Sequence, residues 1–308
     1  MTGEALRARD LRKTYHTKGA PAVDALNGVS LEVRRGERVA LLGRNGAGKT
    51  TFLRIASTLL RPTSGTIEVL GYDADREPDR VRPYIAVVPQ EGRPFFHLTP
   101  REQVYTYLRA RGLGRETAKA RTEASLQAMG LTGFADRLSI TLSGGQRQRT
   151  MVATVIATEA PLLFLDEPSI GMDPFARREV WASLRALTAR GSTILLTTHY
   201  LDEADALSHR LYIVERGEVL VNGTSDDLKR SVGGTLKVTM PGGRAEIERF
   251  RSFGSCVADG ESLTVIVAPE RLGELMQVSV RAGLTATVGP VTLEEAFLRV
   301  VGRSIDED

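Results

Sequence analysis

The chain has 308 residues, enough for one large domain or two unequal ones, and its apolar fraction of 42% suits a globular protein. The formal net charge of +3 is too small to argue for a nucleic-acid partner, and the single cysteine, Cys256, excludes an intrachain disulfide. Residues 1–7 hold no apolar segment typical of a signal peptide, and no uncharged run approaches the ~20 apolar residues that cross a bilayer. We therefore expect any membrane-spanning part to belong to another chain.

Residues 5–33 alternate in short strand-like runs, and a further strand is predicted over residues 65–70. These runs predict an antiparallel sheet that flanks a nucleotide site. Tyr15 lies in a polar segment between two of the runs, a position that favours a loop. Its ring can stack on a nucleobase or pack against the domain, and position alone favours packing.

An apolar strand over residues 39–42 leads into a glycine-rich turn, and a helix opens with Thr51. The turn fits G-x-x-x-x-G-K-[ST] at every fixed position and consists of Gly43, Arg44, Asn45, Gly46, Ala47, Gly48, Lys49 and Thr50. Glycines let backbone N–H groups surround a polyphosphate, and the helix directs its positive end at the same anion. The lysine adds a charge for the β- and γ-phosphates, and the threonine hydroxyl is a ligand for Mg²⁺. The turn therefore predicts a nucleoside triphosphate site.

The next segment combines one strand with a helical region. The strand, over residues 85–90, ends in Gln90, and residues 91–138 are predominantly helical in pattern. Helices are predicted to begin at a capping box near residue 99 and to run over residues 100–111 and 115–129. Three apolar residues ahead of the first helix either belong to the core or form an exposed patch for a partner: Phe95, Phe96 and Leu98.

A second anion site is predicted where another helix begins. The segment is Leu142, Ser143, Gly144, Gly145 and Gln146, and the helix is predicted over residues 147–158. Ser143 is a good N-cap, and the two glycines allow a ligand to approach the first N–H groups of the helix. By itself this segment indicates only a helix start.

Two continuous apolar runs, residues 162–165 and 193–198, are typical of strands buried on both faces of a parallel sheet. The first run is followed by Asp166 and Glu167, and the second by His199. The carboxyl ends of such strands meet at the ligand-binding edge of the sheet. Asp166 can therefore bind Mg²⁺, Glu167 can act on an attacking water, and His199 can reach a γ-phosphate.

After Gly233 and Gly234 the pattern restarts and predicts a separate α+β unit of about 75 residues, near the lower size limit for independent folding. Its strands are predicted over residues 235–240, 262–268 and 284–288, and its helices over residues 245–253, 269–282 and 292–300.

In this order the motifs resemble the ATP-binding subunit of ABC transporters, over residues 5 to about 230. The matching motifs are an aromatic A-loop residue (Tyr15), Walker A (43–50), a Q-loop (Gln90), the LSGGQ signature (142–146), Walker B (162–166), Glu167, a D-loop (169–173) and a switch histidine (His199). The D-loop departs mildly from the family pattern at Ile170 and Met172, without loss of a catalytic group.

The resemblance implies an α/β P-loop NTPase fold of the ABC type. Its parts are a RecA-like core sheet, an antiparallel β subdomain and a helical signature subdomain at about 91–160. The resemblance thus implies an ATP-binding domain over residues 1–230, followed by the C-terminal α+β domain over residues 235–308.

The resemblance also implies ATP and Mg²⁺ as cofactors and assigns roles to single residues. ATP is expected on Tyr15 and residues 43–51, and Mg²⁺ on Thr50, Gln90 and Asp166. Glu167 is expected to polarise water, His199 to contact the γ-phosphate, and Gln90 to sense it. A second ATP-binding subunit is expected to pack head to tail, with its signature, residues 142–146, against Walker A. Asp173 is the site residue expected in the D-loop.

A separate polytopic membrane permease is the other partner that the resemblance implies, with this chain peripheral at the cytoplasmic face of a bacterial membrane. Residues 198–205 and 290–298 are similar to exporters of the daunorubicin-resistance type, which favours export of a drug, natural product or lipid. The alternatives are the ATPase of an ABC importer and a soluble ABC ATPase outside transport. A small-molecule kinase would leave the signature and His199 unexplained.

Overall fold

The computed structural model describes residues 3–232 and 236–306, and these fall into two compact units, Met1–Leu220 and Val221–Asp308. The division between the units lies inside β10 (Glu218–Gly223). The bounds of the ATP-binding domain, residues 1–230, remain a prediction. The predicted joint at Gly233 and Gly234 lies outside the described residues. Within these residues, no helix has both the length and the apolar character needed to span a membrane.

A six-stranded sheet forms the centre of the first unit. Its order is β10-β9-β3-β8-β7-β6, and the strands from β9 to β6 pair in parallel. Their bounds are β3 (Arg38–Leu42), β6 (Ile85–Val88), β7 (Leu162–Asp166), β8 (Thr193–Thr198) and β9 (Arg210–Glu215). All residues of β7 and β8 are buried, as the continuous apolar runs predict.

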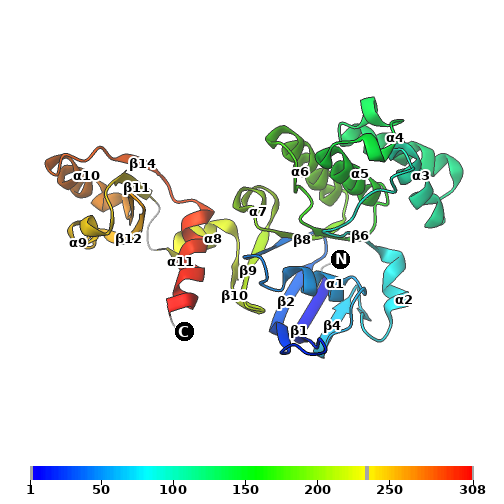
Figure 1. The fold of residues 1–308 in the computed structure, drawn as a ribbon, viewed down its shortest axis with the longest axis horizontal. Coiled ribbons are helices and arrows are strands. Elements are labelled where there is room, and N and C mark those ends of the chain that lie inside the picture. Colours follow the sequence, from blue (N-terminus) through cyan, green and yellow to red (C-terminus); the bar gives the residue numbers. More distant parts are fainter. Residues whose placement is uncertain (1–2, 233–235, 307–308) are drawn as a thin grey trace. The chain divides into compact units, whose positions relative to one another are not determined.

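Helices cover both faces of this sheet (Figure 1). On one face, α1 (Lys49–Ala56) packs between the six-stranded sheet and a second, antiparallel sheet. The opposite face carries α5 (Gly144–Ile156), α6 (Pro174–Ala189) and α7 (Leu201–Leu207). This layering places the loops after β3, β7 and β8 at one edge of the sheet, which is the predicted α/β arrangement.

The second sheet has the order β2-β1-β4-β5 and is antiparallel, as predicted. Its strands are β1 (Glu4–Tyr15), β2 (Val23–Arg34), β4 (Ser64–Val69) and β5 (Tyr72–Asp73). The placement of Tyr15 in a loop is wrong, because Tyr15 is the last residue of β1 and pairs with Val23 of β2. Register shifts in the β1–β2 ladder break the alternation of apolar residues, so the polar end of this strand looked like a loop.

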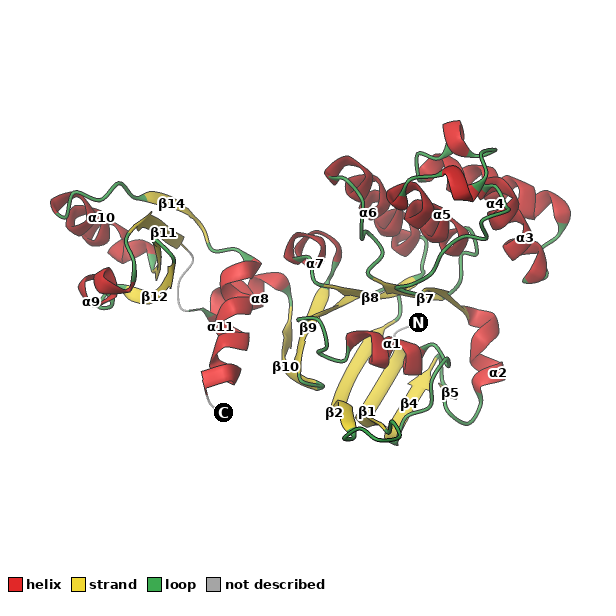
Figure 2. Cartoon of the chain, viewed as in Figure 1, coloured by secondary structure: helices red, strands yellow, loops and turns green. Residues whose placement is uncertain are grey.

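The predicted helical region contains α3 (Pro100–Ala110) and α4 (Arg115–Ala128), preceded by the short α2 (Pro78–Val81) (Figure 2). Thr99 caps α3 in a capping box with Glu102, as its sequence predicts. The helix predicted over residues 147–158 begins earlier, at Gly144, because Ser143 and Gln146 form a second capping box.

The second unit is an α+β fold around the antiparallel sheet β12-β13-β11-β14. Strand β12 (Gly254–Asp259) was not predicted, since its first residues, Gly254 and Ser255, have low strand propensity. The other elements are α8 (Ser225–Ser231), β11 (Leu236–Pro241), α9 (Ile247–Phe250), β13 (Ser262–Val267), α10 (Leu272–Arg281), β14 (Thr287–Pro290) and α11 (Leu293–Asp306). Its core includes Val238, Phe250 and Leu275.

Candidate functional site

The glycine-rich turn joins β3 to α1 and can be built only with glycine at two of its positions. A Cβ atom on Gly43 would lie 2.2 Å from the carbonyl oxygen of Val214. Gly48 has φ +100°, and a Cβ atom there would lie 2.3 Å from the carbonyl oxygen of Ala25. Both contacts are with backbone atoms, so any side chain at either position would displace the turn.

Lys49 is held inside this turn. Its Nζ donates hydrogen bonds to the carbonyl oxygens of Gly43 at 2.8 Å and Arg44 at 3.0 Å. The residue is only 5% exposed, and burial lowers the pKa of its ammonium group against the opposing influence of Glu167 and Asp166. An anion at the turn would therefore stabilise a charge that the protein interior disfavours.

The turn opens into a pocket of about 180 Å³. Its lining joins the phosphate loop to three distant segments: Ala25, Asn45, Gly46, Ala47, Gly48, Lys49, Thr50, Thr51, Gln90 and Glu167. The structure thus brings Gln90 and Glu167 to the loop, as the parallel strand order predicts.

Three oxygen atoms converge beside Lys49. Thr50 Oγ1 lies 3.1 Å from Asp166 Oδ1 and 3.3 Å from Gln90 Oε1, and the Thr197 hydroxyl donates to Asp166 Oδ1. Burial raises the pKa of Asp166, although the hydrogen bonds from Thr197 and Thr50 oppose this shift. A hydroxyl, an amide oxygen and a carboxylate form an oxygen-only donor set, which is the kind that Mg²⁺ prefers.

Glu167 and His199 contact each other at the ends of β7 and β8. His199 Nδ1 lies 3.0 Å from Glu167 Oε2. The Glu167 residue is 5% exposed and has φ 50°, a left-handed conformation that is uncommon outside glycine. Its N–H donates to Thr197 O at 3.1 Å and Thr197 Oγ1 at 3.2 Å, so β8 holds this unusual backbone in place.

Tyr15 reaches the phosphate-loop helix from the end of β1. Its hydroxyl lies 3.4 Å from Thr51 Oγ1, and Lys13 Nζ lies 5.5 Å from the centre of its ring. The residue remains 37% exposed, so part of the ring is accessible. It can therefore present an aromatic surface beside the pocket as well as pack against the domain.

The start of α5 is exposed at Ser143 and Gly144, and no residue of the segment 142–146 lines the phosphate-loop pocket described above. A different hollow of about 620 Å³ joins Gly144 to Gln90 and to residues 170–171 after Walker B. At the start of α6, the backbone N–H groups of Ala176 and Phe175 donate to Asp173 and hold its pKa below its usual range.

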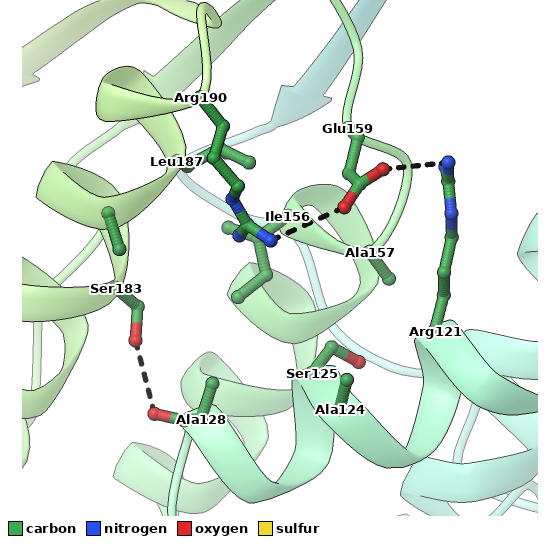
Figure 3. Close-up of a pocket in the computed structure, with 11 residues that line it drawn as sticks. Arg121, Ala124, Ser125, Ala128, Ile156, Ala157, Glu159, Ser183, Leu187 and Arg190 are labelled. Carbon is green, nitrogen blue, oxygen red and sulfur yellow. Dashed lines mark hydrogen bonds and ion pairs between the residues drawn. The ribbon is translucent and has the colours of Figure 1, made fainter.

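A further pocket of about 260 Å³ lies between α4, α5 and α6 (Figure 3). Its hydroxyl groups are bonded within the fold, since Ser183 Oγ donates to Ala128 O at 3.2 Å and Ser125 Oγ donates to Thr122 O. Arg121 and Arg190 both pair with Glu159 at its rim. The charged groups at the rim of this pocket thus pair with one another, whereas the smaller pocket at Lys49 is lined by the glycine-rich turn.

Comparison with known proteins decides the family. The family model described as ABC transporter matches residues 26–170. The chain is 37% identical to the daunorubicin/doxorubicin resistance ATP-binding protein of Streptomyces peucetius, over 98% of this chain and 94% of that protein. The chain belongs to the ABC transporter family.

Two further comparisons support this ABC ATPase assignment. The chain is 35% identical to Nod factor export ATP-binding protein I of Burkholderia orbicola, over 97% of both chains. A dimeric ATP-binding cassette in a post-hydrolysis state, bound to ADP and phosphate, superposes with a TM-score of 0.66 at 27% identity, over 71% of this chain and 98% of that one. The predicted ABC ATPase fold and the predicted ATPase activity are therefore confirmed.

One buried carboxyl group of this ABC subunit was not singled out from the sequence. Glu203 lies in α7 among acidic neighbours and resembles a surface residue, yet its exposed fraction is 0%. Trp181 Nε1 donates a hydrogen bond of 3.1 Å to Glu203 Oε1. Burial raises the pKa of Glu203, against the hydrogen-bonding influence of Thr198, Ser169 and Trp181.

Replacement of Glu203 by Gln should change how stability depends on pH. A raised pKa means that the folded ABC subunit binds this proton more tightly than the unfolded chain. The resulting stabilisation is fully present below the ordinary value of 4.5 and is lost as pH rises through the folded value. As pH rises above 4.5, we expect the free energy of unfolding of Glu203→Gln to increase relative to that of the wild type.

Urea unfolding at several pH values, followed by the fluorescence of the single tryptophan, Trp181, measures this difference. The exposed Glu116→Gln on α4 is the matched control and should show no such trend. A Glu203→Gln difference that stays constant with pH would contradict the expectation.

Proposed function

We propose that this chain is the ATP-hydrolysing subunit of an exporter for a drug, natural product or lipid. The observation that carries the hydrolytic role is the contact of Glu167 with His199 beside the phosphate loop. Relatives named for daunorubicin/doxorubicin resistance and for Nod factor export support the direction of transport, and a relative named for phospholipid transport supports a lipid as one class of cargo.

ATP binds to the phosphate loop, residues 43–51, with its phosphates on backbone N–H groups and on Lys49. The Tyr15 ring stacks on the adenine, a role supported by its exposed face and its contact with Thr51. Mg²⁺, when bound, neutralises phosphate charge, and the oxygens of Thr50, Gln90 and Asp166 suit its ligand preference.

In hydrolysis, Glu167 accepts a proton from the attacking water, and His199 orients Glu167 and contacts the γ-phosphate. The hydrogen bonds that the Glu167 N–H donates to Thr197 O and Thr197 Oγ1 keep the carboxylate of Glu167 near this position. Gln90 senses the γ-phosphate, since it contacts Thr50 and lies at the start of the segment that leads to residues 95–96.

A second copy of the chain completes each site. The helix start at residues 142–146, exposed at Ser143 and Gly144, is a second anion site that is absent from the lining of the phosphate-loop pocket. In a head-to-tail pair, these residues of one subunit bind the γ-phosphate held by the other. The dimeric state of a similar solved cassette supports this arrangement.

The membrane permease docks on an exposed apolar patch of the helical region. Phe95 is 70% exposed and Phe96 39%, and Ile140, 58% exposed, donates its N–H to Phe96 O at 3.3 Å. Leu98 is partly buried, so the two phenylalanines form the accessible part of the segment. Docking there connects the permease to Gln90, five residues before Phe95, and keeps this subunit at the cytoplasmic face of the membrane.

Replacement of Lys49 by Ala should weaken ATP binding by at least about 2 kcal/mol, or roughly 30-fold, because charge-assisted hydrogen bonds to the phosphates are lost. Equilibrium titration with a fluorescent ATP analogue measures the change. The exposed Lys119→Ala on α4 is the control. In the same titration, Tyr15→Ala should weaken ATP binding by about 1–3 kcal/mol, because the stacking of adenine on the ring is lost. Unchanged affinity in Lys49→Ala would contradict the assignment of the site.

Replacement of Glu167 by Gln should preserve ATP binding and abolish turnover, because the amide keeps the shape of the carboxylate but cannot accept the proton. Uncleaved ATP should then hold two chains together, which light scattering after gel filtration detects. Phosphate release and mass are both measured with Mg²⁺ and ATP.

Two matched variants complete that experiment. Glu179→Gln, an exposed change on α6, should behave as wild type. Ser143→Arg added to Glu167→Gln should return the mass to that of a monomer while each chain still binds ATP. Wild-type turnover in Glu167→Gln would remove Glu167 as the base, and a dimer that survives Ser143→Arg would argue against the head-to-tail arrangement.

Replacement of Phe95 by Asp should abolish co-purification with the membrane partner and lower export of an amphipathic drug from cells, while ATP binding stays intact. The charge makes docking of this patch on an apolar surface unfavourable. Leu59→Asp is the control, because Leu59 is also exposed, at 63%, but lies outside the patch. Full export by Phe95→Asp would rule out this docking surface.

A further inference from the structure

The pocket of about 260 Å³ between α4, α5 and α6 shares no lining residue with the phosphate-loop pocket, and two helix faces form its walls (Figure 3). Residues three, four and seven positions apart share one face of a helix, and the wall residues have this spacing. The walls consist of Arg121, Ala124, Ser125 and Ala128 from α4, and of Ser183, Ala186, Leu187 and Arg190 from α6 and its C-terminal end. Small side chains in the middle of both faces leave the space between the helices unfilled.

The interior of this pocket is apolar. Ile156 and Ala157, at the end of α5, and Leu187 on α6 are buried and line it. Its two hydroxyl groups, on Ser125 and Ser183, donate to backbone carbonyl oxygens. An apolar chain that enters the pocket would therefore leave water without separating a polar group of the protein from its partner.

The two ends of the pocket differ in charge (Figure 3). At one end, Ser183 Oγ donates to Ala128 O at 3.2 Å and joins the two walls. At the other end, Glu159 lies between two arginines, with Arg121 Nη2 2.7 Å from Glu159 Oε2 and Arg190 Nη1 3.5 Å from Glu159 Oε1. Glu159 has φ 52°, a left-handed conformation that is uncommon outside glycine. The charged groups are therefore gathered at one end, around a residue of unusual backbone conformation.

This charged end has one positive charge in excess, because two guanidinium groups share one carboxylate. Arg121 is fixed further, since its Nη1 donates to Thr158 O at 3.0 Å. Arg190 is less constrained: its side chain is 65% exposed, and over residues 3–232 and 236–306 its one hydrogen bond or ion pair is the 3.5 Å contact with Glu159. Most of the five N–H donors of this guanidinium therefore remain open to an anion.

We propose that this pocket binds a medium-chain carboxylate, a free acid with an apolar tail. The tail lies between α4 and α6 against Ile156 and Leu187, and the carboxylate accepts hydrogen bonds from Arg190. The volume lies just under the range of about 300–1,000 Å³ for drug-sized ligands, so it suits a chain of roughly eight carbons. It is too small for a helix of a partner protein, which is about 10–12 Å across.

Isothermal titration calorimetry of the full-length chain with sodium octanoate, in the absence of nucleotide, tests the site. We expect one site per chain with a Kd of about 1 mM or lower, which is within the range for ligands of this size. Octylammonium has the same chain length and the opposite charge, and it should bind at least about tenfold more weakly because of the excess positive charge. Failure of octanoate to bind with such a Kd, or equal affinity for the two ions, would overturn the proposal.

A pocket-filling variant tests the position of the tail. Ala186→Leu should weaken octanoate binding at least about tenfold, because the larger side chain occupies the space that the tail needs. Ala189→Leu, exposed on the same helix and outside the lining, is the matched control and should bind as the wild type does. If thermal melting shows that Ala186→Leu does not fold, Ala124→Leu fills the pocket from α4 instead. Equal affinity in the pocket-filling variant and the control would overturn the assignment of the site.

Arg190→Gln tests recognition of the carboxylate. It should weaken octanoate binding at least about fivefold, because a neutral amide makes weaker hydrogen bonds to an anion than a guanidinium does. Arg178→Gln, an exposed change on α6 outside the pocket, is the control. Wild-type affinity in Arg190→Gln would overturn the proposal. Because these titrations contain no nucleotide, their outcome does not depend on the proposed function in ATP hydrolysis.

Discussion

The parallel register of β3, β8 and β7 is the constraint on which the site depends. In the two ladders, Leu42 lies opposite Thr198, and Thr197 lies opposite Asp166, so the three strands end at the same level. Each strand delivers one component there: the phosphate loop, the pair of carboxylates or the histidine. A slip of one residue would turn every side chain of a strand to the other face, so the buried apolar runs of these strands fix the chemistry as well as the core.

The second requirement is that buried charges keep partners. Lys49 and Asp166 are 5% and 2% exposed. Burial lowers the pKa of the lysine and raises the pKa of the aspartate, so in both cases it favours the neutral form. Backbone carbonyls accept from the lysine, and threonine hydroxyls donate to the aspartate. A phosphate makes charge-assisted hydrogen bonds with an ammonium group that are stronger than those of neutral carbonyls, and a cation can coordinate a carboxylate directly, so these two buried charges suit the triphosphate and metal ion that we propose.

Most of the first unit could be predicted from the sequence because its signals are local. The buried strands, the phosphate loop and the caps at Thr99 and Ser143 each depend on a few neighbouring residues. The features that escaped prediction depend on distant pairing. Tyr15 continues a strand only because β2 pairs with it, and Glu203 is buried only because α7 packs on α6. No local pattern distinguishes such a glutamate from its exposed neighbours.

The helix that begins at the signature segment also has a direct connection to the hydrolytic edge. Its capping box joins Ser143 to Gln146, while the first N–H groups of a helix have no partner inside it and remain open to an anion. From the same helix, Gln148 Nε2 donates to the carbonyl oxygens of Glu167 and Pro168 at 3.4 and 3.3 Å. The backbone that carries the carboxylate of Glu167 is therefore bonded on one side to the signature helix and on the other to β8. A displacement of the signature helix would therefore move the backbone of Glu167 through the hydrogen bonds of Gln148, without involving the phosphate loop.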